Sequence, residues 1–254
     1  MTEETNGVRI SRLYLPQPLQ SGLHLELDED SGHYVRSVLR LKKEARLALF
    51  NGHGGEWQAR TVEVSRRRVA VEVGQWREKD VESPLQTWLA LAISRSDRMD
   101  LSVQKAVELG VNCITPLFTE RCMVKLTAEK TEQKLLHWQN IARHAAEQCG
   151  RTVVPEVRRP VQIHDWLVTA EGLKIFLDPR AHSTMTGLQP GQGKVTLLSG
   201  PEGGFADHER DTAGHAGFIP VRLGRRILRA ETAALAALAA VQMLWGDFAG
   251  DNGS

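Results

Sequence analysis

The sequence predicts an α/β protein in which a small β domain precedes a larger domain built on a mostly parallel sheet. Three observations support this fold class. Up to residue 76, short runs of alternating apolar residues are separated by turn signals such as the glycine-rich segment 51–55. From residue 84 onward, strand-like runs alternate with helical periods, which is typical of a parallel sheet covered by helices. Between them lies the charged segment 77–84, which ends in proline and has the composition of a linker.

The first domain is expected to contain four strands and one helix, forming a small β-barrel or sheet. The periodicity predicts strands over residues 23–27, 46–50, 56–64 and 68–73, and a helix over residues 33–41. One face of this helix would carry Val35, Val38 and Leu39. On another face, Arg36 and Arg40 would lie side by side at positions i and i+4.

These two helix arginines, together with Arg9 and Arg12 near the start of the chain, suit the binding of phosphate groups. Acidic residues nearly balance basic ones in this domain, so a solvated charged surface is an equal alternative. The whole chain has a net charge of only +1, and any nucleic-acid binding must therefore depend on local basic patches.

The larger domain is expected to alternate strands with helices. The pattern predicts strands over residues 87–93, 113–118, 173–177 and 195–199, and helices over residues 98–109, 128–149 and 230–245. In parallel sheets of this kind, ligands bind beyond the carboxyl ends of the strands. The loops 178–187 and 200–204 both follow such ends, and we expect a ligand there.

The loop 200–204, Gly-Pro-Glu-Gly-Gly, is the more informative of the two. Its glycines can adopt positive φ and leave backbone amides bare, so that the backbone can touch a ligand. Pro201 fixes one φ angle, and Glu202 is the only anionic hydrogen-bond acceptor in the loop. An ordinary turn at the end of a strand is the alternative interpretation.

The predicted helix 230–245 is apolar nearly all round, because alanines alternate with leucines and leave no polar face. Such a helix must be covered on all sides. Either the core of the domain or a second subunit covers it, and the sequence leaves both open.

Several classes of protein are excluded or disfavoured. The N-terminus does not resemble a secretory signal and no apolar run approaches the ~20 residues of a membrane span, so we expect a soluble cytoplasmic protein. The three cysteines are widely spaced and are expected to be buried apolar residues, not disulfide partners or zinc ligands. The chain also lacks a complete dinucleotide fingerprint, P-loop, nucleophile elbow or HExxH zinc pattern.

Two segments carry a resemblance to a known family: GPEGGF at residues 200–205 and LGRRILRAETA at residues 223–233. With these, the chain resembles the RsmE family, the 16S ribosomal RNA uridine-N3 methyltransferases of the SPOUT superfamily. Four further segments, HYVRSVLRLK, KAVELGV, PLFTERC and AAEQCGRTVVPEV, occur in the expected order. The family usually has threonine and serine where this chain has Ala230 and Cys149.

The resemblance implies a fold and a set of partners that periodicity alone does not indicate. It implies a PUA-like RNA-binding β-barrel over residues 1–76 and a SPOUT domain with a C-terminal trefoil knot over residues 84–254. General rules of topology would have predicted an open, doubly wound sheet for the second domain. It further implies S-adenosylmethionine as the cofactor, no metal, a homodimer, and 16S ribosomal RNA or the small ribosomal subunit as the partner.

The resemblance also implies site residues. Cofactor contacts are expected from Leu177, Ser199, Gly200, Glu202, Gly203, Leu223, Gly224, Ile227, Leu228 and Thr232. RNA contacts are expected from Arg9, Arg12, Arg36, Arg40, Lys105 and Arg151. Removing the imide proton of a uridine requires a base or a cation that stabilises the developing anion, and Arg229 and Glu231 are the candidates. The alternative for these two residues is a mutual ion pair at the start of a helix.

Two other functions stay open at this point. The chain could be a SPOUT methyltransferase that modifies a different RNA, which a test of purified RNAs as methyl acceptors would distinguish. It could also be a non-catalytic ribosome-assembly factor that binds RNA through the β domain. Failure to bind S-adenosylmethionine would favour that second alternative.

Overall fold

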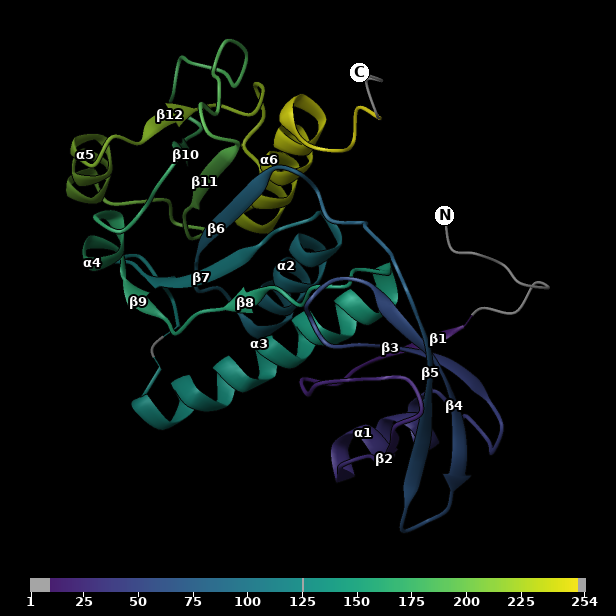
Figure 1. Cartoon of the computed structure of the whole chain (residues 1–254). Coiled ribbons are helices and arrows are strands. Elements are labelled where there is room, and N and C mark those ends of the chain that lie inside the picture. The colour runs from purple at the N-terminus through teal and green to yellow at the C-terminus, as the bar shows by residue number, and fades with distance from the viewer. Residues whose placement is uncertain (1–9, 125, 251–254) are drawn as a thin grey trace. The chain divides into compact units, whose positions relative to one another are not determined.

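Two separate sheets organise the chain, one in each of two units (Figure 1). The computed structural model describes residues 10–124 and 126–250. Unit 1 contains the residues up to Glu82 together with Ala146–Val154, and unit 2 contains Ser83–Ala145 and the residues from Pro155 onward. The division after Glu82 lies inside the segment 77–84, where the sequence predicts a linker.

Unit 1 is built on a five-stranded sheet with the order β1-β3-β4-β5-β2. Its strands are β1 (Ser11–Tyr14), β2 (His24–Glu26), β3 (Arg46–Phe50), β4 (Glu56–Val64) and β5 (Val69–Arg77). The outer strand β1 pairs in parallel with β3, and the other pairs are antiparallel. Alternate residues of these strands, among them Leu13, Leu49 and Val71, form the buried core of the unit. The predictions of β3 and β4 are confirmed, whereas β1 was not predicted.

The predicted helix 33–41 is wrong in its limits and in its faces. The chain forms a short helix α1 (Glu29–His33), capped by Asp28, which continues into a single π-helical segment η1 (Tyr34–Val38). The wider π turn rotates side chains away from the α-helical positions, so Val35 is buried while Val38 is 60% exposed.

Unit 1 includes the segment Ala146–Val154 because strand β1 binds it. The guanidinium group of Arg12 donates to the backbone oxygens of Ala146 and Arg151, at 3.0 and 2.9 Å. The backbone N–H of Tyr14 donates to the carboxylate of Glu147 at 3.0 Å. No pattern in the sequence indicated this association, because its partners are more than 130 residues apart.

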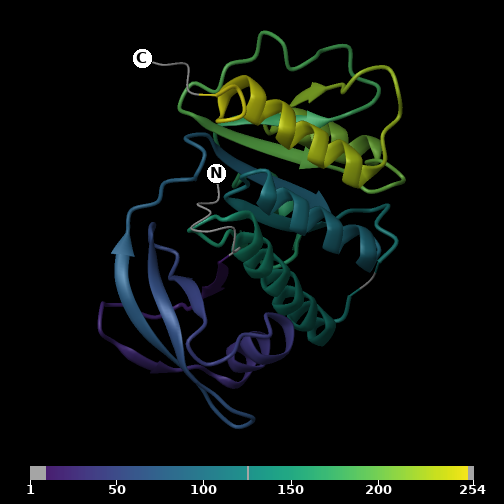
Figure 2. The ribbon, with the colours of Figure 1, turned by 90° about the vertical axis from the view of Figure 1, so that its right-hand side faces the viewer.

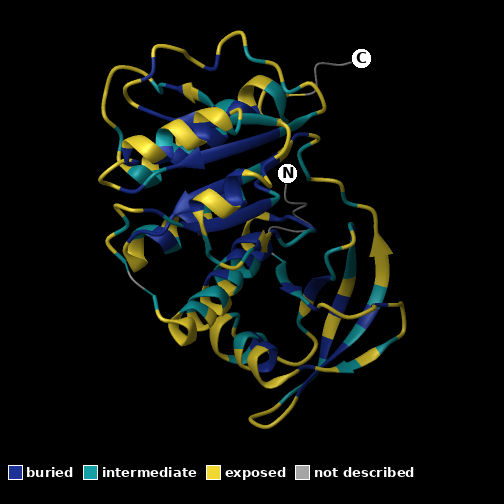
Figure 3. Cartoon of the chain, turned by 90° about the vertical axis from the view of Figure 1, so that its left-hand side faces the viewer, coloured by how far each residue is buried: buried dark blue, intermediate teal, exposed yellow. Residues whose placement is uncertain are grey.

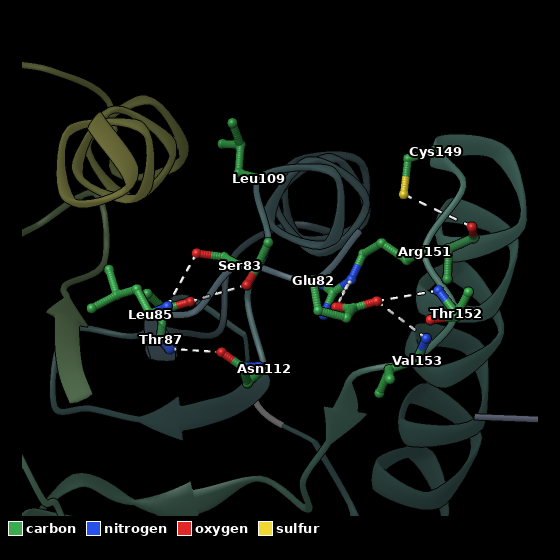
Figure 4. A network of polar contacts seen from close by, with 12 residues as sticks. Glu82, Ser83, Leu85, Thr87, Leu109, Asn112, Cys149, Arg151, Thr152 and Val153 are labelled. Carbon is green, nitrogen blue, oxygen red and sulfur yellow. Dashed lines mark hydrogen bonds and ion pairs between the residues drawn. The ribbon is translucent and has the colours of Figure 1, made fainter. Parts of the chain in front are cut away.

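The boundary between the units falls between two residues that are both held by hydrogen bonds (Figure 4). Within unit 1, the carboxylate of Glu82 accepts from the backbone N–H groups of Thr152 and Val153 and from the side chain of Arg151. Within unit 2, the hydroxyl of Ser83 donates to the side chain of Gln242 at 2.7 Å. The predicted linker is thus held by hydrogen bonds at Glu82 and Ser83.

Unit 2 is built on a seven-stranded sheet in which every pair is parallel. The strand order is β12-β10-β11-β6-β7-β8, and β9 also pairs with β7. The strands are β6 (Gln86–Ala92), β7 (Cys113–Phe118), β8 (Glu156–Val157), β9 (Val161–Gln162), β10 (Leu173–Leu177), β11 (Lys194–Ser199) and β12 (Ile219–Val221). The prediction of an α/β protein with a mostly parallel sheet is therefore confirmed.

Helices cover both faces of this sheet (Figures 1 and 2). They are α2 (Ser96–Glu108), α3 (Ala128–Cys149), α4 (Ile163–Leu167), α5 (Asp207–His215) and α6 (Ala230–Trp245). Helices α2 and α6 pack against each other, and α6 lies on the central strands. Helix α4 contributes Trp166 to a core cluster that also contains Phe205, Phe218 and Phe176 of β10. The central strands β6, β7 and β11 are mostly buried between these layers (Figure 3).

Helix α6 matches its predicted limits, and the structure shows what covers one side of it. Ala234, Ala237, Leu238 and Val241 are fully buried within unit 2. Away from this face, the apolar side chains of Ala236 and Met243 are exposed, and Leu244 is exposed near the end of the helix. The core of the unit therefore covers part of the helix, and an apolar surface remains.

The cysteines match the prediction of burial fully in only one case, Cys113. Cys113 is buried and Cys122 is half-buried, but Cys149 is exposed at the end of α3. The prediction that all three are buried is therefore wrong for Cys149, which lies on the last turn of its helix.

Candidate active site

The carboxyl ends of the central strands of unit 2 bring the predicted cofactor loops to one edge of the sheet. Strand β10 ends at Leu177, β11 at Ser199 and β12 at Val221, and β10 lies between the other two. Because parallel strands point the same way, the three loops that follow them meet at this edge. The hydroxyl of Ser199 also donates to the backbone oxygen of Ala230 at 3.4 Å, which joins β11 to the start of α6.

A hollow lies at this edge, and three predicted cofactor residues, Leu177, Leu223 and Leu228, line it. Its other lining residues are Asp178, Pro179, Val221, Arg222, Arg226 and Ala233. Most of these walls are apolar, which suits a flat aromatic group such as a nucleobase.

The acidic residue in this lining is neutralised by its surroundings. Asp178 is 4% exposed, and both of its carboxylate oxygens form an ion pair with Arg210 of α5. One of the same oxygens accepts from the backbone N–H of Arg180 at 2.9 Å. Asp178 therefore fixes the loop after β10 and is not a free base.

The glycine loop 200–204 depends on its glycines at two positions. Gly204 has a φ of +67°, which favours glycine over any residue with a side chain. A Cβ atom at Gly200 would lie 2.7 Å from the ring of Phe205, so no larger residue fits without moving the loop. From the segment after β7, Arg121 donates to the backbone oxygen of Gly203 at 3.1 Å.

A second arginine that the sequence did not indicate, Arg98, joins two predicted site residues. Its Nη1 lies 2.8 Å from Oε1 of Glu202, and its Nε lies 3.9 Å from Oε1 of Glu231. Arg98 and Arg121 follow strands β6 and β7, whose carboxyl ends lie at the same edge as the glycine loop. Their positions just after predicted strands could have marked Arg98 and Arg121 as candidate site residues. Only the order of the strands in the sheet, however, shows that they lie near the glycine loop.

Glu231 has one carboxylate oxygen without a hydrogen-bond partner. Its side chain is 11% exposed, and its second oxygen, Oε2, is buried without a hydrogen-bond partner. A buried carboxylate oxygen is costly to leave unpaired, so its presence points to a partner that the isolated chain does not supply.

Arg229, the other predicted catalytic residue, does not contact Glu231. It is the N-cap residue of α6, is exposed, and forms no ion pair with Glu231 or any other residue in the described part of the chain. The alternative interpretation of a mutual Arg229–Glu231 ion pair is therefore wrong. Arg225 and Arg226, in the same loop before α6, are likewise exposed and unpaired among the described residues.

Some predicted cofactor residues face the solvent. Ile227 is 88% exposed, and Thr232 and Gly224 are exposed as well. Gly224 has a φ of +77°, and no atom lies within 4 Å of the position that its Cβ would take. There is therefore open space beside Gly224, in the same loop as Leu223 and Leu228, which line the hollow.

Two of the predicted RNA contacts are engaged inside unit 1. The side chain of Arg12 is 9% exposed and pairs with Glu56 at 3.0 Å, in addition to its bonds to backbone oxygens. The side chain of Arg151 is 6% exposed and pairs with Glu82 at 2.6 Å. Since both guanidinium groups bind protein atoms, we correct these two assignments and consider both residues structural.

The remaining predicted RNA contacts are more accessible. Lys105 of α2 is partly exposed and pairs with Glu108 one turn later. Arg36 is half-buried on η1, while Arg40 is exposed beyond it with a φ of +53°. The two do not share a helical face as predicted, because the π-helical turn and the left-handed residue change the spacing. Arg9 lies outside the described residues.

The described part of the chain offers neither a cluster of metal ligands nor a membrane-spanning helix. It contains no group of three or more histidine, cysteine, aspartate or glutamate side chains that could hold a metal ion. None of its helices is long and apolar enough to cross a membrane. Near the glycine loop, burial raises the pKa of the Cys122 thiol, so this residue is a poor nucleophile at neutral pH.

The residues at this edge fit S-adenosylmethionine. The apolar hollow suits an adenine ring, and the glycine-rich loops allow the backbone to approach a ligand closely. The carboxylate of Glu202, held by Arg98, is 30% exposed and can accept hydrogen bonds from ribose hydroxyls. The site contains no P-loop or dinucleotide fingerprint that would suit a pyrophosphate.

Comparison with protein families defines the class of protein. A model described as an RNA methyltransferase domain matches residues 81–242, and a model described as an RNA methyltransferase PUA domain matches residues 27–74. The two matches correspond to the parallel sheet of unit 2 and the five-stranded sheet of unit 1. The fold is thus a PUA-like β domain followed by a SPOUT methyltransferase domain.

Comparison with individual proteins narrows the assignment to one family. Ribosomal RNA small subunit methyltransferase E of Buchnera aphidicola from Schizaphis graminum is 39% identical over 94% of this chain and 98% of its own length. The protein of the same name from Bacillus subtilis is 26% identical over 91% of this chain and 96% of its own. The chain belongs to the family of ribosomal RNA small subunit methyltransferase E.

Two solved structures agree with this assignment. A methyltransferase of Legionella pneumophila, in complex with the bound cofactor SAM, superposes with a TM-score of 0.92 at 43% identity, over 95% of this chain and 100% of its own. Ribosomal RNA small subunit methyltransferase E of Neisseria gonorrhoeae, bound to S-adenosyl methionine, superposes with a TM-score of 0.88 at 37% identity, over 94% of this chain and 99% of its own.

Proposed function

We propose that this protein transfers a methyl group from S-adenosylmethionine to N3 of a specific uridine in 16S ribosomal RNA. The observation that carries the proposal is the unpaired, buried Oε2 of Glu231 beside the glycine loop. An acceptor in that position suits the N3–H of a uracil, which must lose its proton before N3 can be methylated. Family membership supports ribosomal RNA of the small subunit as the substrate.

The cofactor would lie along the carboxyl edge of the sheet. Its adenine would lie against Leu177, Leu223 and Leu228, and Glu202 would accept from its ribose. The other predicted contacts are Ser199, Gly200, Gly203, Gly224, Ile227 and Thr232. When bound, the cofactor supplies a cationic sulfonium whose methyl group is already activated for transfer.

The chain's own residues would handle the proton and the charge. Glu231 accepts the N3 proton at Oε2, and Arg229 stabilises the negative charge that develops on O2 and O4 of the uracil. Arg229 is suited to this because no carboxylate of the described chain neutralises it. Alignment of the reacting atoms by the surrounding loops supplies much of the remaining rate enhancement.

RNA binding would involve both domains. The PUA-like domain, residues 1–76, would contact phosphates through Arg36 and Arg40, with Arg9 as a further contact. The methyltransferase domain, residues 84–254, would add Lys105 and the exposed arginines of the loop before α6. We further propose that the C-terminal strands form the trefoil knot implied by the family resemblance, and that the protein works in the cytoplasm, where ribosomes are assembled.

We also propose a homodimer in which the exposed side of α6 is covered by a second copy. The support is the apolar surface of Ala236, Met243 and Leu244, which are exposed on the helix. Met243→Asp should give a folded monomer in sedimentation experiments, since Met243 is 58% exposed. Leu238→Asp is a poorer test because Leu238 is fully buried and an aspartate there should unfold the protein. A wild-type protein that sediments as a monomer at micromolar concentration would contradict the dimer.

The function is tested by mass spectrometry of 16S ribosomal RNA from a strain that lacks the protein. We expect one 3-methyluridine to be missing and to return when the wild-type gene, but not a Glu231→Gln variant, is supplied. An unchanged modification pattern would contradict the proposal. Methyl transfer to another purified RNA would instead favour a SPOUT enzyme with a different substrate, and failure to bind S-adenosylmethionine would favour an assembly factor.

A further inference from the structure

We propose that Arg98 is a positioning residue that holds the carboxylates of Glu202 and Glu231 together, so that the cofactor loop and the catalytic carboxylate act as one unit. This inference rests on the proposed function and adds a residue to it. Arg98 comes from the first turn of α2, Glu202 from the loop after β11, and Glu231 from the first turn of α6.

The geometry suits one guanidinium between two carboxylates. Arg98 Nη1 donates to Glu202 at 2.8 Å, and Nε lies 3.9 Å from Glu231. A planar guanidinium presents several N–H donors at fixed angles, which allows it to serve two acceptors at once. Without this cation, two carboxylates in the same small region would repel each other, and Glu231 would no longer be held in one orientation.

A comparison with another buried glutamate indicates that the arrangement is more than a structural ion pair. Glu209 of α5 is 5% exposed, and its two oxygens both accept from backbone N–H groups, of Glu120 at 2.8 Å and Ala206 at 2.9 Å. Glu231 is nearly as buried, yet Arg98 approaches only Oε1 and leaves Oε2 unpaired. Both oxygens of Glu209 therefore have hydrogen-bond partners within the fold, whereas Oε2 of Glu231 is buried without one.

The test compares Arg98→Ala and Arg98→Lys with a control on the same helix, Gln104→Ala, whose side chain is exposed. Single-turnover methylation is measured with RNA and S-adenosylmethionine both saturating. Because a misplacement of about 1 Å can cost about 100-fold in rate, we expect a loss of roughly 10- to 100-fold in Arg98→Ala. Arg98→Lys should recover part of the rate, and Gln104→Ala should match the wild type. Thermal melting of each variant confirms that it is folded.

A double-mutant cycle separates positioning from a general effect on structure. If Arg98 acts through Glu231, the variant carrying both Arg98→Ala and Glu231→Gln should be no slower than Glu231→Gln alone. Rate losses that multiply in the double variant would overturn the inference, as would an Arg98→Ala enzyme that turns over at the wild-type rate.

A binding measurement keeps the inference independent of the proposed reaction. Calorimetry without RNA gives the affinity for S-adenosylmethionine of Arg98→Ala, Glu202→Gln and the double variant. We expect both single variants to bind more weakly and the double variant to bind no more weakly than the worse of them. If the wild type methylates no uridine but this pattern holds, the proposed function fails and the role of Arg98 stands. If Arg98→Ala binds as tightly as the wild type while Glu202→Gln does not, the inference about Arg98 is wrong.

Discussion

The two edges of the parallel sheet in unit 2 differ in how completely their charged residues are paired. At the amino edge, Lys194 at the start of β11 donates to Glu171 at 2.7 Å and lies 4.6 Å from the ring centre of Trp88. Arg158 covers the same ring at 5.2 Å and donates to Glu156 at 3.1 Å. Each of these charges therefore has an opposite charge or an aromatic face beside it.

At the carboxyl edge some charges are paired, as in Asp178 with Arg210 and Glu202 with Arg98, but others are not. Arg225, Arg226 and Arg229 are exposed and form no ion pair within the described chain. Glu231 keeps a buried oxygen without a partner, although Arg98 lies beside it. A buried carboxylate oxygen without a partner is costly, so the one at Glu231, close to exposed arginines without carboxylate partners, suits an edge that a ligand completes.

The largest expected effect tests this contrast directly with two carboxylates. Glu231→Gln at the carboxyl edge should slow single-turnover methylation by about 10²- to 10⁴-fold, because an amide cannot accept the N3 proton as a base. Glu156→Gln at the amino edge should leave the rate unchanged. Both substitutions preserve side-chain volume, so circular dichroism should show folded proteins. If the two variants were equally active, the assignment of the carboxyl edge as the catalytic one would be wrong.

A smaller effect is expected from a pair of glycines. Gly200→Ala places a Cβ 2.7 Å from Phe205 and must shift the cofactor loop, whereas Gly191 has no atom within 4 Å of its Cβ position. Overpacking of this kind costs about 1–3 kcal/mol, which corresponds to a loss of about 5- to 140-fold in affinity if the ligand feels the loop shift. Calorimetry with S-adenosylmethionine should show this loss for Gly200→Ala and none for Gly191→Ala. Equal affinities would show that the loop does not contact the cofactor.

The sequence predicted the long periodic elements of this sheet well and the site only in part. Strand β7, helix α3 and helix α6 have the predicted limits, because each has enough residues for its pattern to be clear. The short elements β12 and α4 were missed, since three to five residues hardly define a period.

Contacts between distant segments were beyond the reach of periodicity. Arg98 could not be assigned, because its role depends on β6 lying next to β11 in the sheet, which the order of the strands along the chain does not reveal. For the same reason Arg12 was assigned to RNA, when the fold places it against the end of α3. Residue types at strand ends thus predicted where the site lies, but not which side chains from other segments contact its residues.

A modest effect is expected on the salt dependence of RNA binding. Arg225 at the carboxyl edge is unpaired, whereas Arg158 at the amino edge is held by Glu156 and Trp88. If Arg225 contacts one phosphate, Arg225→Ala should reduce the slope of log affinity against log salt by about 0.7 to 0.9. Arg158→Ala should leave the slope as it is. Fluorescence anisotropy at several salt concentrations measures both, and equal slopes for wild type and Arg225→Ala would exclude the phosphate contact.

The smallest expected effect concerns the pH dependence of stability at the amino edge. The hydrogen bond from Lys194 and its positive charge lower the pKa of the Glu171 carboxyl below its ordinary value of 4.5. A depressed pKa in the folded state means that the pair stabilises the protein above the unfolded pKa and that this contribution is lost as the pH falls through the folded pKa. Since Glu171 is exposed, solvent screens the pair and its contribution is small. Glu171→Gln should therefore melt slightly below the wild type at pH 7, and the difference should vanish in strongly acidic solution, while methylation at pH 7 stays unchanged. A Glu171→Gln enzyme with impaired turnover would mean that the amino edge also serves the reaction, and the contrast between the two edges would no longer hold.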